Sequence, residues 1–367
     1  MKVGVLGGGQ LGRMLALAGY PLGVHVRCLD ALTDAPAGAL CELVVGDYAD
    51  AVTLARFAEG VAVITYEFEN VPVTTARQLA EFCPVYPPPL ALEKAQDRLV
   101  EKSFLRELAI PTPPFLAVES RADLDEALTQ IGLPAVLKTR RLGYDGKGQA
   151  VLRQPQDRET AWASLQGSPL ILEGWVNFDR ELSLLAVRST TGEIAFYPLV
   201  ANEHRDGILR ISRAPAPNLT PALQALAEAY AQRILDALQY VGVLAIEFFQ
   251  VGQMLLANEM APRVHNSGHW TIEGAVTSQF ANHLCAILGL PLGDTAAIGQ
   301  SVMLNLIGTL PDRVAVLAVP GAHLHLYDKA PRPGRKLGHI TLRADEAQTL
   351  EARLVQLQKL IDPSAPA

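Results

Sequence analysis

Two glutamates interrupt segments that are otherwise apolar, and such acids need a compensating partner. Glu247 lies within Val243–Phe249, and Glu259 lies within Met254–Met260. A buried carboxylate without a cation or a hydrogen-bond donor is costly. The two segments predict a hairpin around residues 250–253, in which an odd loop or a β-bulge would bring both acids to one face. A five-residue loop would set Glu247 opposite Ala257 with Glu259 about 7–8 Å away on the diagonal, whereas an even loop without a bulge would separate the acids.

Paired carboxylates of this kind predict a magnesium site. Mg²⁺ prefers oxygen ligands and is usually shared between one or two carboxylates and the phosphates of a nucleotide. One or two ions would fit the expected separation, and Mn²⁺ is an alternative. If the hairpin instead lies in solvent at the edge of a sheet, the two acids are ordinary surface residues.

A lysine followed by a glycine-rich loop is typical of a site that holds phosphate. Lys138 lies near the end of the predicted strand 135–139, and Gly143, Gly146 and Gly148 follow within a few residues. Lysine reaches phosphate as a compact point charge, and a mobile glycine loop can close over a substrate and exclude water. The alternative is a plain hairpin turn, because Asp-Gly is itself a turn signal.

A second glycine-rich loop stands near the N-terminus and permits a different interpretation. Gly7, Gly9 and Gly12 follow one short strand, and Asp30 ends the next. This arrangement fits the dinucleotide fingerprint, so an NAD-dependent oxidoreductase is a rival hypothesis. Amides at a helix N-terminus can bind any phosphorylated ligand, however, and the loop could also be a tight turn without a ligand.

The elements that must position these residues alternate between strand and helix over the first hundred residues. Strands are predicted at 2–6, 24–29 and 61–65, with a helix at 13–18, which favours a parallel α/β sheet. Three prolines at 87–89 end this unit, and one charged helix is predicted over 91–108. Further helices are predicted at 221–238, 278–288 and 344–361, and further strands at 170–173, 181–187 and 194–200.

Composition excludes several classes of protein. The chain has 367 residues and a net charge of −7, which gives no support for nucleic-acid binding. No apolar run approaches the roughly 18–20 residues of a membrane helix, so we expect a cytoplasmic protein. The four cysteines have no metal-binding or disulfide spacing. Against the negative total, Lys329, Arg332, Arg335 and Lys336 concentrate positive charge in eight residues and predict a local anion site.

Seven segments occur in an order that resembles the N5-carboxyaminoimidazole ribonucleotide synthetase family of the ATP-grasp superfamily. They are GGGQLGRM (7–14), TYEFENV (65–71), QDR (96–98), GYDGKGQ (143–149), FYPLVANEHRDGILR (196–210), NEMAPRVHNSGHWT (258–271) and YDKAPRPGRKLGHI (327–340). The resemblance covers residues 1 to about 342. It implies an α/β protein with the ATP-grasp fold: an N-terminal Rossmann-like pre-ATP-grasp domain (1–100), an ATP-grasp domain (101–300) with a central lid at about 115–175, and a C-terminal α+β domain (301–367).

The reaction that the resemblance implies is a carboxylation in de novo purine (IMP) biosynthesis. This carbon–nitrogen ligase would use ATP and bicarbonate to carboxylate 5-aminoimidazole ribonucleotide, releasing ADP and phosphate, with carboxyphosphate as the expected intermediate. The reaction would require Mg²⁺ and would not require biotin. Members of the family usually form homodimers. The alternative within the superfamily is a ligase such as formate-dependent glycinamide ribonucleotide transformylase.

The resemblance also implies roles for individual residues. On the ATP side it places Arg98, Lys138, Gly143, Tyr144, Asp145, Gly146, Lys147, Gly148, Gln149, Glu173, Gly174, Trp175, Val176, Glu181, His204, Asn258 and Glu259. Glu247 and Glu259 match the metal ligands. For the ribonucleotide it places Gln10, Glu67, Tyr144, Arg263, His265, Lys329, Arg332 and Arg335. The expected catalytic residues are Arg263, His265, Asp145 and Lys138, and either His265 or Asp145 would accept the proton of the amine.

Overall fold

The alternation of strand and helix in the first hundred residues produces a four-stranded parallel sheet, as predicted. The computed structural model describes residues 1–143 and 145–361. The strand order is β3-β2-β1-β4, with β1 (Lys2–Leu6), β2 (His25–Asp30), β3 (Glu42–Val45) and β4 (Val63–Tyr66). The neighbouring helices are α1 (Gln10–Gly19), α2 (Ala51–Ala58) and α3 (Val73–Leu79), with short 3₁₀ turns at Tyr20–Leu22 and Pro36–Ala39. The helix predicted at 13–18 therefore begins three residues earlier, directly after the glycine loop.

The single helix predicted over 91–108 is wrong, because the chain forms two helices there. These are α4 (Pro89–Ala95) and α5 (Arg98–Glu107). Asp97 adopts an extended backbone between them, and its side chain accepts hydrogen bonds from the Leu99 and Val100 amides. Aspartate is a favoured N-cap residue because its carboxylate satisfies amides that have no partner in the first helical turn. The break lets α5 turn toward the middle of the molecule.

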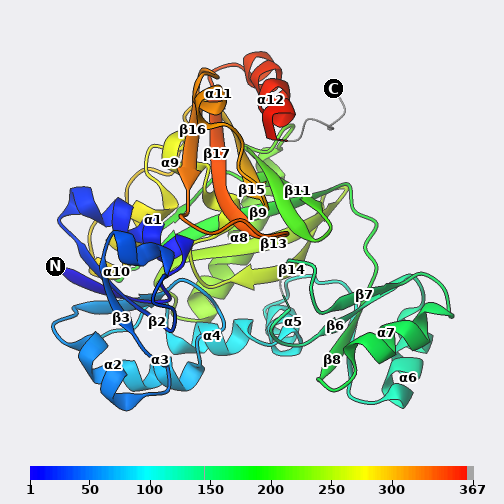
Figure 1. Cartoon of the computed structure of the whole chain (residues 1–367). Coiled ribbons are helices and arrows are strands. Elements are labelled where there is room, and N and C mark those ends of the chain that lie inside the picture. Colours follow the sequence, from blue (N-terminus) through cyan, green and yellow to red (C-terminus); the bar gives the residue numbers. More distant parts are fainter. Residues whose placement is uncertain (144, 362–367) are drawn as a thin grey trace.

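A small antiparallel sheet follows and forms a separate layer at the right of Figure 1. Its order is β5-β8-β6-β7, with β5 (Phe115–Val118), β8 (Leu170–Gly174), β6 (Ala135–Thr139) and β7 (Gln149–Leu152). Helices α6 (Arg121–Ile131) and α7 (Asp157–Leu165) pack on it. The glycine-rich loop predicted from the sequence connects β6 to β7, so it leaves this small unit at one edge.

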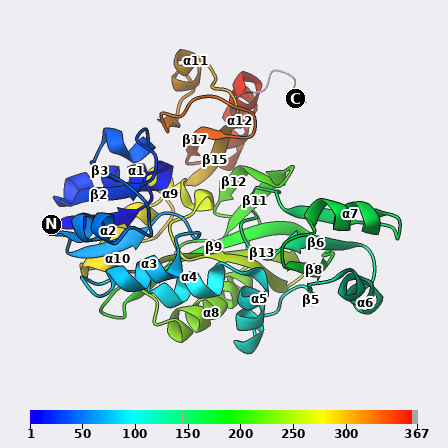
Figure 2. The same cartoon turned by 60° about the horizontal axis from the view of Figure 1, so that its bottom comes forward.

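The largest sheet in the described residues has nine strands and runs through the centre of the molecule (Figure 2). Its main path is β14-β13-β9-β11-β12-β15-β17-β16, and β10 also pairs with β9. The strands are β9 (Arg180–Arg188), β10 (Ile194–Phe196), β11 (Val200–Arg205), β12 (Ile208–Ala214), β13 (Gly242–Val251), β14 (Met254–Ala261), β15 (Gln300–Ile307), β16 (Ala322–Leu326) and β17 (Lys336–Ala344). The C-terminal strands β15 to β17 thus continue the sheet that carries the glutamate hairpin.

Alternation along the central strands separates a core face from a polar face. Leu182, Leu184, Ile246 and Phe248 are buried against helix α8 (Pro221–Ala237) in one hydrophobic cluster. The remaining helices are α9 (Thr271–Gly274), α10 (Gln279–Leu288), α11 (Arg313–Leu317) and α12 (Ala347–Ile361), with a 3₁₀ turn at Asn266–Gly268. No helix among the described residues is both long enough and apolar enough to cross a membrane.

Candidate active site

The two glutamates lie directly opposite each other on β13 and β14. Val251 pairs with Met254 across a two-residue turn, so the five-residue loop considered from the sequence is wrong. The register then shifts by one residue at a β-bulge, because Phe248 pairs with Ala257 while Glu247 pairs with Glu259. Residues paired across an antiparallel ladder project to the same face. The bulge, which was the second possibility, is therefore what brings the acids together.

This pairing of like charges is electrostatically unfavourable unless a cation accompanies it. Burial and the charge of Glu259 raise the pKa of Glu247 to about 7. Burial and Glu259 also raise the pKa of a third acid, Glu101 on α5, to about 8. Within residues 1–143 and 145–361, no three His, Cys, Asp or Glu side chains gather as a complete metal site. A cation held by the glutamate pair would therefore need further oxygen ligands, which the phosphates of a nucleotide supply.

A second acid–imidazole pair shares this polar face. Glu181 on β9 lies two residues from Ser183, which is opposite Glu247. The Nδ1 atom of His204 on β11 is 2.5 Å from the Glu181 carboxylate. Burial lowers the pKa of His204, but the Glu181 hydrogen bond and the charge of Glu247 outweigh it, and the net shift is upward. The pair resembles a clamp for hydroxyl groups, since carboxylates accept and a protonated imidazole donates.

Lys138 lies near the end of β6, and a second lysine that was not predicted lies close to it. The Lys138 Nζ atom donates to Glu173 on β8 at 2.9 Å. Lys102 on α5 approaches the same Glu173 oxygen at 3.3 Å and is only 1% exposed. The other Glu173 oxygen is buried without a hydrogen-bond partner. The carboxylate and the two ammonium groups form a charged cluster between the small sheet and the glutamate hairpin.

The root of the glycine loop is anchored by the residues that separate α4 from α5. Arg98 donates to the backbone oxygens of Thr139 at 3.0 Å and Gly143 at 3.1 Å. Asp97 forms a bidentate ion pair with Arg140, with contacts of 2.9 to 3.1 Å. The guanidinium predicted as a phosphate-side cation thus contacts the loop backbone in this structure.

Asp145 and Gly146 of the glycine loop 143–149 contact the central sheet at β17 and at the turn between β11 and β12. Asp145 accepts a hydrogen bond from Lys336 on β17 at 2.6 Å. Gly146 lies against the turn between β11 and β12, so closely that a Cβ atom on Gly207 would lie 2.7 Å from the Gly146 nitrogen. Gln149 begins β7 opposite Lys138. Tyr144, predicted at both the nucleotide and the ribonucleotide, lies outside the described residues.

In the predicted adenine-binding segment, residues 173–176, two backbone amides have partners within the protein and one large side chain is exposed. The Gly174 amide donates to the Pro114 oxygen at 2.8 Å, and the Trp175 amide donates to the Pro134 oxygen at 3.2 Å. The Trp175 side chain is 41% exposed. These two amides fix the course of the segment, which then leaves the small sheet and continues through Val176 toward β9.

The N-terminal glycine loop holds a carboxylate of the protein itself. Glu67, directly after β4, accepts hydrogen bonds from the amides of Gly9 and, at 2.7 Å, Gly12. Burial raises the pKa of Glu67, although the two amides and Lys329 act in the opposite direction. Lys329 also donates to Gln10 in the first turn of α1. Three of the residues predicted at the ribonucleotide are therefore in one place.

The hydrogen bonds of Asp30 and Glu67 disfavour the NAD hypothesis. Asp30 accepts from the Gly8 amide at 2.7 Å and from the Leu32 amide at 2.9 Å, so it faces its own loop rather than a ribose. A dinucleotide pyrophosphate would have to displace the buried Glu67 carboxylate from Gly9 and Gly12. The amides of the N-terminal glycine loop already donate to Glu67, so they are not free to bind a phosphate.

Arg263 and His265 follow β14 and connect the two halves of the site. The Arg263 Nε atom donates to Glu69 at 2.5 Å, which places the guanidinium beside the strand end that also carries Glu67. His265 Nε2 lies 3.6 Å from the Glu247 carboxylate. Its Nδ1 atom accepts a hydrogen bond from the Ser267 amide at 3.4 Å and lies 2.9 Å from the Ser267 hydroxyl. Because an amide can only donate, neutral His265 carries its proton on Nε2, toward Glu247.

The basic loop before β17 is spread between the site and the surface. Burial lowers the pKa of Lys329 to about 8, and the positive charges of Arg335, Lys336 and Arg332 add to this effect. Arg335 donates to the Ala330 oxygen of its own loop at 3.2 Å. Arg332 is exposed. The effect of these three cations on Lys329 indicates a local concentration of positive charge, although the net charge of the chain is negative.

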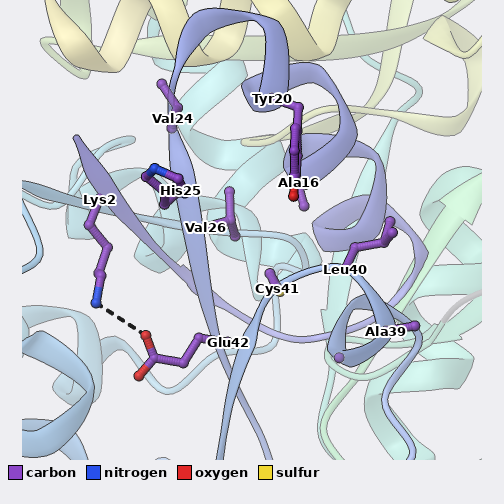
Figure 3. Close-up of a pocket in the computed structure, with 11 residues that line it drawn as sticks. Lys2, Ala16, Tyr20, Val24, His25, Val26, Ala39, Leu40, Cys41 and Glu42 are labelled. Atoms are coloured by element: carbon purple, nitrogen blue, oxygen red, sulfur yellow. Dashed lines mark hydrogen bonds and ion pairs between the residues drawn. The ribbon is translucent and has the colours of Figure 1, made fainter.

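One cavity lies away from all of these residues. It measures about 500 Å³, beside α1, β2 and the start of β3, and Figure 3 shows Tyr20, His25, Cys41 and Glu42 around it. None of the predicted site residues lines it. The candidate site is instead the polar face of the central sheet, between the N-terminal parallel sheet, the glycine loop 143–149 and β17.

Three residues of the site, Glu69, Glu101 and Lys102, were not predicted from the sequence. Glu101 and Lys102 lie within a helix predicted only as charged, and no motif distinguished them from its other charged residues. Glu69 lies in the TYEFENV segment, two residues after Glu67, and this pair of nearby acids could have indicated it. All three act through contacts with residues more than 70 positions away.

Comparison with families of known sequence gives three matches along the chain. Residues 1–96 match the ribonucleotide synthetase preATP-grasp domain, residues 103–280 match the ATP-grasp domain, and residues 301–353 match the phosphoribosylaminoimidazole carboxylase C-terminal domain. The N5-carboxyaminoimidazole ribonucleotide synthase of Pseudomonas aeruginosa is 56% identical over 362 residues, which are 99% of this chain and 100% of that protein. The synthase of Vibrio cholerae is 42% identical and covers 100% of this chain and 97% of its own length.

Solved structures agree with these matches. The crystal structure of the N5-carboxyaminoimidazole ribonucleotide synthetase from Thermus thermophilus superposes with a TM-score of 0.95 at 62% identity, covering 100% of this chain and 99% of that one. The Aspergillus clavatus synthase in complex with ADP and 5-aminoimidazole ribonucleotide has a TM-score of 0.92 at 33% identity, covering 99% of this chain and 98% of that one.

Proposed function

Because the chain belongs to the N5-carboxyaminoimidazole ribonucleotide synthase family of ATP-dependent ligases, we propose that it carboxylates 5-aminoimidazole ribonucleotide in purine biosynthesis. ATP and bicarbonate are the co-substrates, and N5-carboxyaminoimidazole ribonucleotide, ADP and phosphate are the products. The γ-phosphoryl group activates bicarbonate as carboxyphosphate. A carbon–nitrogen bond then forms between the carboxyl carbon and the exocyclic amine, the phosphate leaves, and the amine loses one proton.

The observation that carries this proposal is the junction at β14. One short stretch supplies Glu259 to the glutamate pair and then Arg263 and His265 to the opposite side, with His265 Nε2 3.6 Å from Glu247. A phosphorylated intermediate formed at the glutamate pair would therefore lie beside an arginine and an imidazole donor. This short path supports a ligase that transfers an activated carboxyl between two bound substrates.

We assign Glu247 and Glu259 as ligands of one or two Mg²⁺ ions, with Mn²⁺ as a substitute. Their direct pairing and the raised pKa of Glu247 support a divalent cation between them. When bound, the metal offsets negative charge on the nucleotide phosphates during transfer. We also assign Asn258, the bulged residue of β14 directly before Glu259, to the nucleotide.

The nucleotide occupies the space between the small sheet and the polar face. Lys138 binds the phosphates, the loop 143–149 closes over them, and Glu181 with His204 binds the ribose hydroxyls. Residues 173–176 line the adenine, where Trp175 supplies apolar surface. Arg98 holds the root of the loop through Thr139 and Gly143, and it contributes positive charge to the phosphates from there.

The ribonucleotide occupies the opposite side, where Gln10, Glu67 and Lys329 meet. Lys329, Arg332 and Arg335 bind its phosphate, which suits a dianion. Arg263, held by Glu69, orients bicarbonate. The two candidates for accepting the amine proton differ in geometry: His265 already carries its proton toward the site, whereas the Asp145 carboxylate is an acceptor held by Lys336. We therefore assign the proton to Asp145 and a hydrogen-bond donor role to His265.

We propose the domain limits 1–100, 101–300 and 301–367, with the lid at about 115–175. We also propose that the protein is a cytoplasmic homodimer, as expected for its class of metabolic enzyme. Light scattering during gel filtration tests the dimer directly. A mass of twice 39.5 kDa is expected for the dimer.

The test of the function is a coupled assay of ADP release. We expect Mg²⁺-dependent ADP release that 5-aminoimidazole ribonucleotide with bicarbonate stimulates. Formate with glycinamide ribonucleotide is the matched alternative pair of substrates. Stimulation by that pair alone, or by neither pair, would contradict the proposed reaction.

A further inference from the structure

The bulge that aligns the glutamates leaves backbone groups of β14 that the ladder cannot satisfy. The extra residue on the bulged strand is Asn258, since Ala257 and Glu259 pair with consecutive residues of β13. A bulged residue disrupts the ladder locally. In addition, β14 is the edge of the nine-stranded sheet, so every second amide and carbonyl faces away from β13. A buried backbone group without a partner is costly.

Two adjacent side chains of α5 satisfy these groups. The Lys102 Nζ atom donates to the Asn258 oxygen at 2.9 Å. The Glu101 Oε1 atom accepts from the Met260 amide at 2.6 Å. Glu101 is 2% exposed and Lys102 is 1% exposed, so neither contact competes with solvent. The two contacts lie one residue before and one residue after Glu259, and they fix the backbone on both sides of it.

Without the bulge, Glu259 would leave the polar face. The turn pairs Val251 with Met254, and a regular ladder continued from there would set Glu259 opposite Ile246. Ile246 belongs to the apolar face that packs against α8. A slip of one residue moves a strand's side chains to the other face of the sheet. The position of Glu259 beside Glu247 therefore depends on the bulge and on whatever stabilises it.

We propose that Glu101 and Lys102 are positioning residues that hold the β14 bulge and thereby set the geometry of the Glu247–Glu259 metal pair. The inference rests on the metal assignment within the proposed function. It assigns to the two residues a role that acts through the backbone of β14.

Lys102 has a second contact that makes its role distinguishable from that of Glu101. The same Nζ atom lies 3.3 Å from the Glu173 oxygen that Lys138 binds at 2.9 Å. Removal of Lys102 therefore disturbs the nucleotide side as well as the bulge. Glu101 is a carboxylate and cannot pair with Glu173, which makes it the cleaner position for a test, and a glutamine variant matches the loss of its charge beside Glu259.

The test compares Glu101→Met with Glu101→Gln in the full-length protein. Glutamine keeps an acceptor oxygen for the Met260 amide, whereas methionine has a similar length and no acceptor. Glu107→Met is the control, because Glu107 is an exposed glutamate on the same helix. Two quantities are measured: Mn²⁺ binding in the presence of ADP by electron paramagnetic resonance, and hydrogen exchange of the Met260 amide in metal-free protein.

We expect Glu101→Met to weaken Mn²⁺ binding by about 10- to 100-fold, the range typical of residues that orient metal ligands. The Met260 amide should exchange faster in the same variant by at least about tenfold. Glutamine should restore most of both properties, and Glu107→Met should change neither. If the methionine variant fails to fold, Glu101→Ala carries the same expectation without added bulk.

The outcomes separate the two levels of the proposal. If the unmodified protein binds Mn²⁺ with ADP and Glu101→Met binds it equally well, the positioning role is wrong and the function stands. Unchanged exchange at Met260 would likewise overturn it. If the unmodified protein binds no Mn²⁺ with ADP, the metal assignment in the proposed function is wrong.

Discussion

Lys329 should impose a pH dependence on the capture of the ribonucleotide. Its pKa is lowered to about 8 by burial and by the nearby Arg335, Lys336 and Arg332. A lowered lysine pKa means that the charged form is present below about pH 8 and is lost as the pH rises through that value. The phosphate of the substrate is a dianion from pH 7 upward, since its second pKa is about 6. Binding therefore weakens as Lys329 loses its proton.

The magnitude follows from the fraction of charged lysine. With a pKa of about 8, Lys329 is about nine-tenths charged at pH 7 and about one-tenth charged at pH 9. If the charged form is required, kcat/KM for the ribonucleotide falls about tenfold over this range. The decline should be absent from kcat/KM for ATP, because Lys329 contacts Gln10 and interacts electrostatically with Glu67 on the other side of the site.

The assay is ADP release at limiting ribonucleotide from pH 7 to pH 9. Lys329→Arg is the matched variant, because arginine stays charged throughout this range. Its profile should lose the decline above pH 8, whatever its absolute rate. Lys329→Met should be slow at every pH. A flat profile for the unmodified enzyme, or an unchanged decline in Lys329→Arg, would refute the assignment of Lys329 to the phosphate.

Three further substitutions test other parts of the site. Glu259→Gln should lower kcat by at least about 100-fold through loss of a metal ligand, without lowering the melting temperature; near-normal turnover would remove the metal assignment. Arg335→Ala should raise KM for the ribonucleotide about tenfold by removing a charge-assisted hydrogen bond, and an effect confined to ATP would mean that the basic loop is misplaced. Gly207→Ala should raise KM for ATP, because its Cβ atom would lie 2.7 Å from the Gly146 nitrogen and hold the lid away. Gly192→Ala is its control, since Gly192 also has a positive φ, of 88°, but its Cβ atom would meet nothing within 4 Å; equal effects of both would attribute the change to backbone strain.

The elements that depend on local pattern could be predicted from the sequence. The strands at 2–6 and 135–139 are where they were expected, because short apolar runs bounded by turn residues have few alternatives. The single helix predicted over 91–108 was wrong because the direction of the chain there depends on contacts with distant residues. Its pattern continued through Gln96 and Asp97, yet Asp97 caps a second helix whose direction is set by packing and by the Arg140 ion pair.

The glutamate hairpin marks the limit of such reasoning. Its two acids and its strands were evident, but the register had two acceptable solutions that differ in which face Glu259 occupies. Turn length alone would have placed the acids apart. The bulge decides the matter, and it is stabilised by Glu101 and Lys102, which lie more than 150 residues earlier in the chain.

The chemistry of the NEMAPRVHNSGHW segment and of the two glycine loops is determined by the sequence itself, because the residue types limit what each can bind. What only the tertiary structure decided is how those groups are used. Glu67 occupies the amides of the N-terminal glycine loop, and Glu69 holds the Arg263 guanidinium. The physical reason is that hydrogen bonds between distant segments form only after the sheets have packed. A donor or acceptor that looks available in the sequence can therefore already have a partner in the fold.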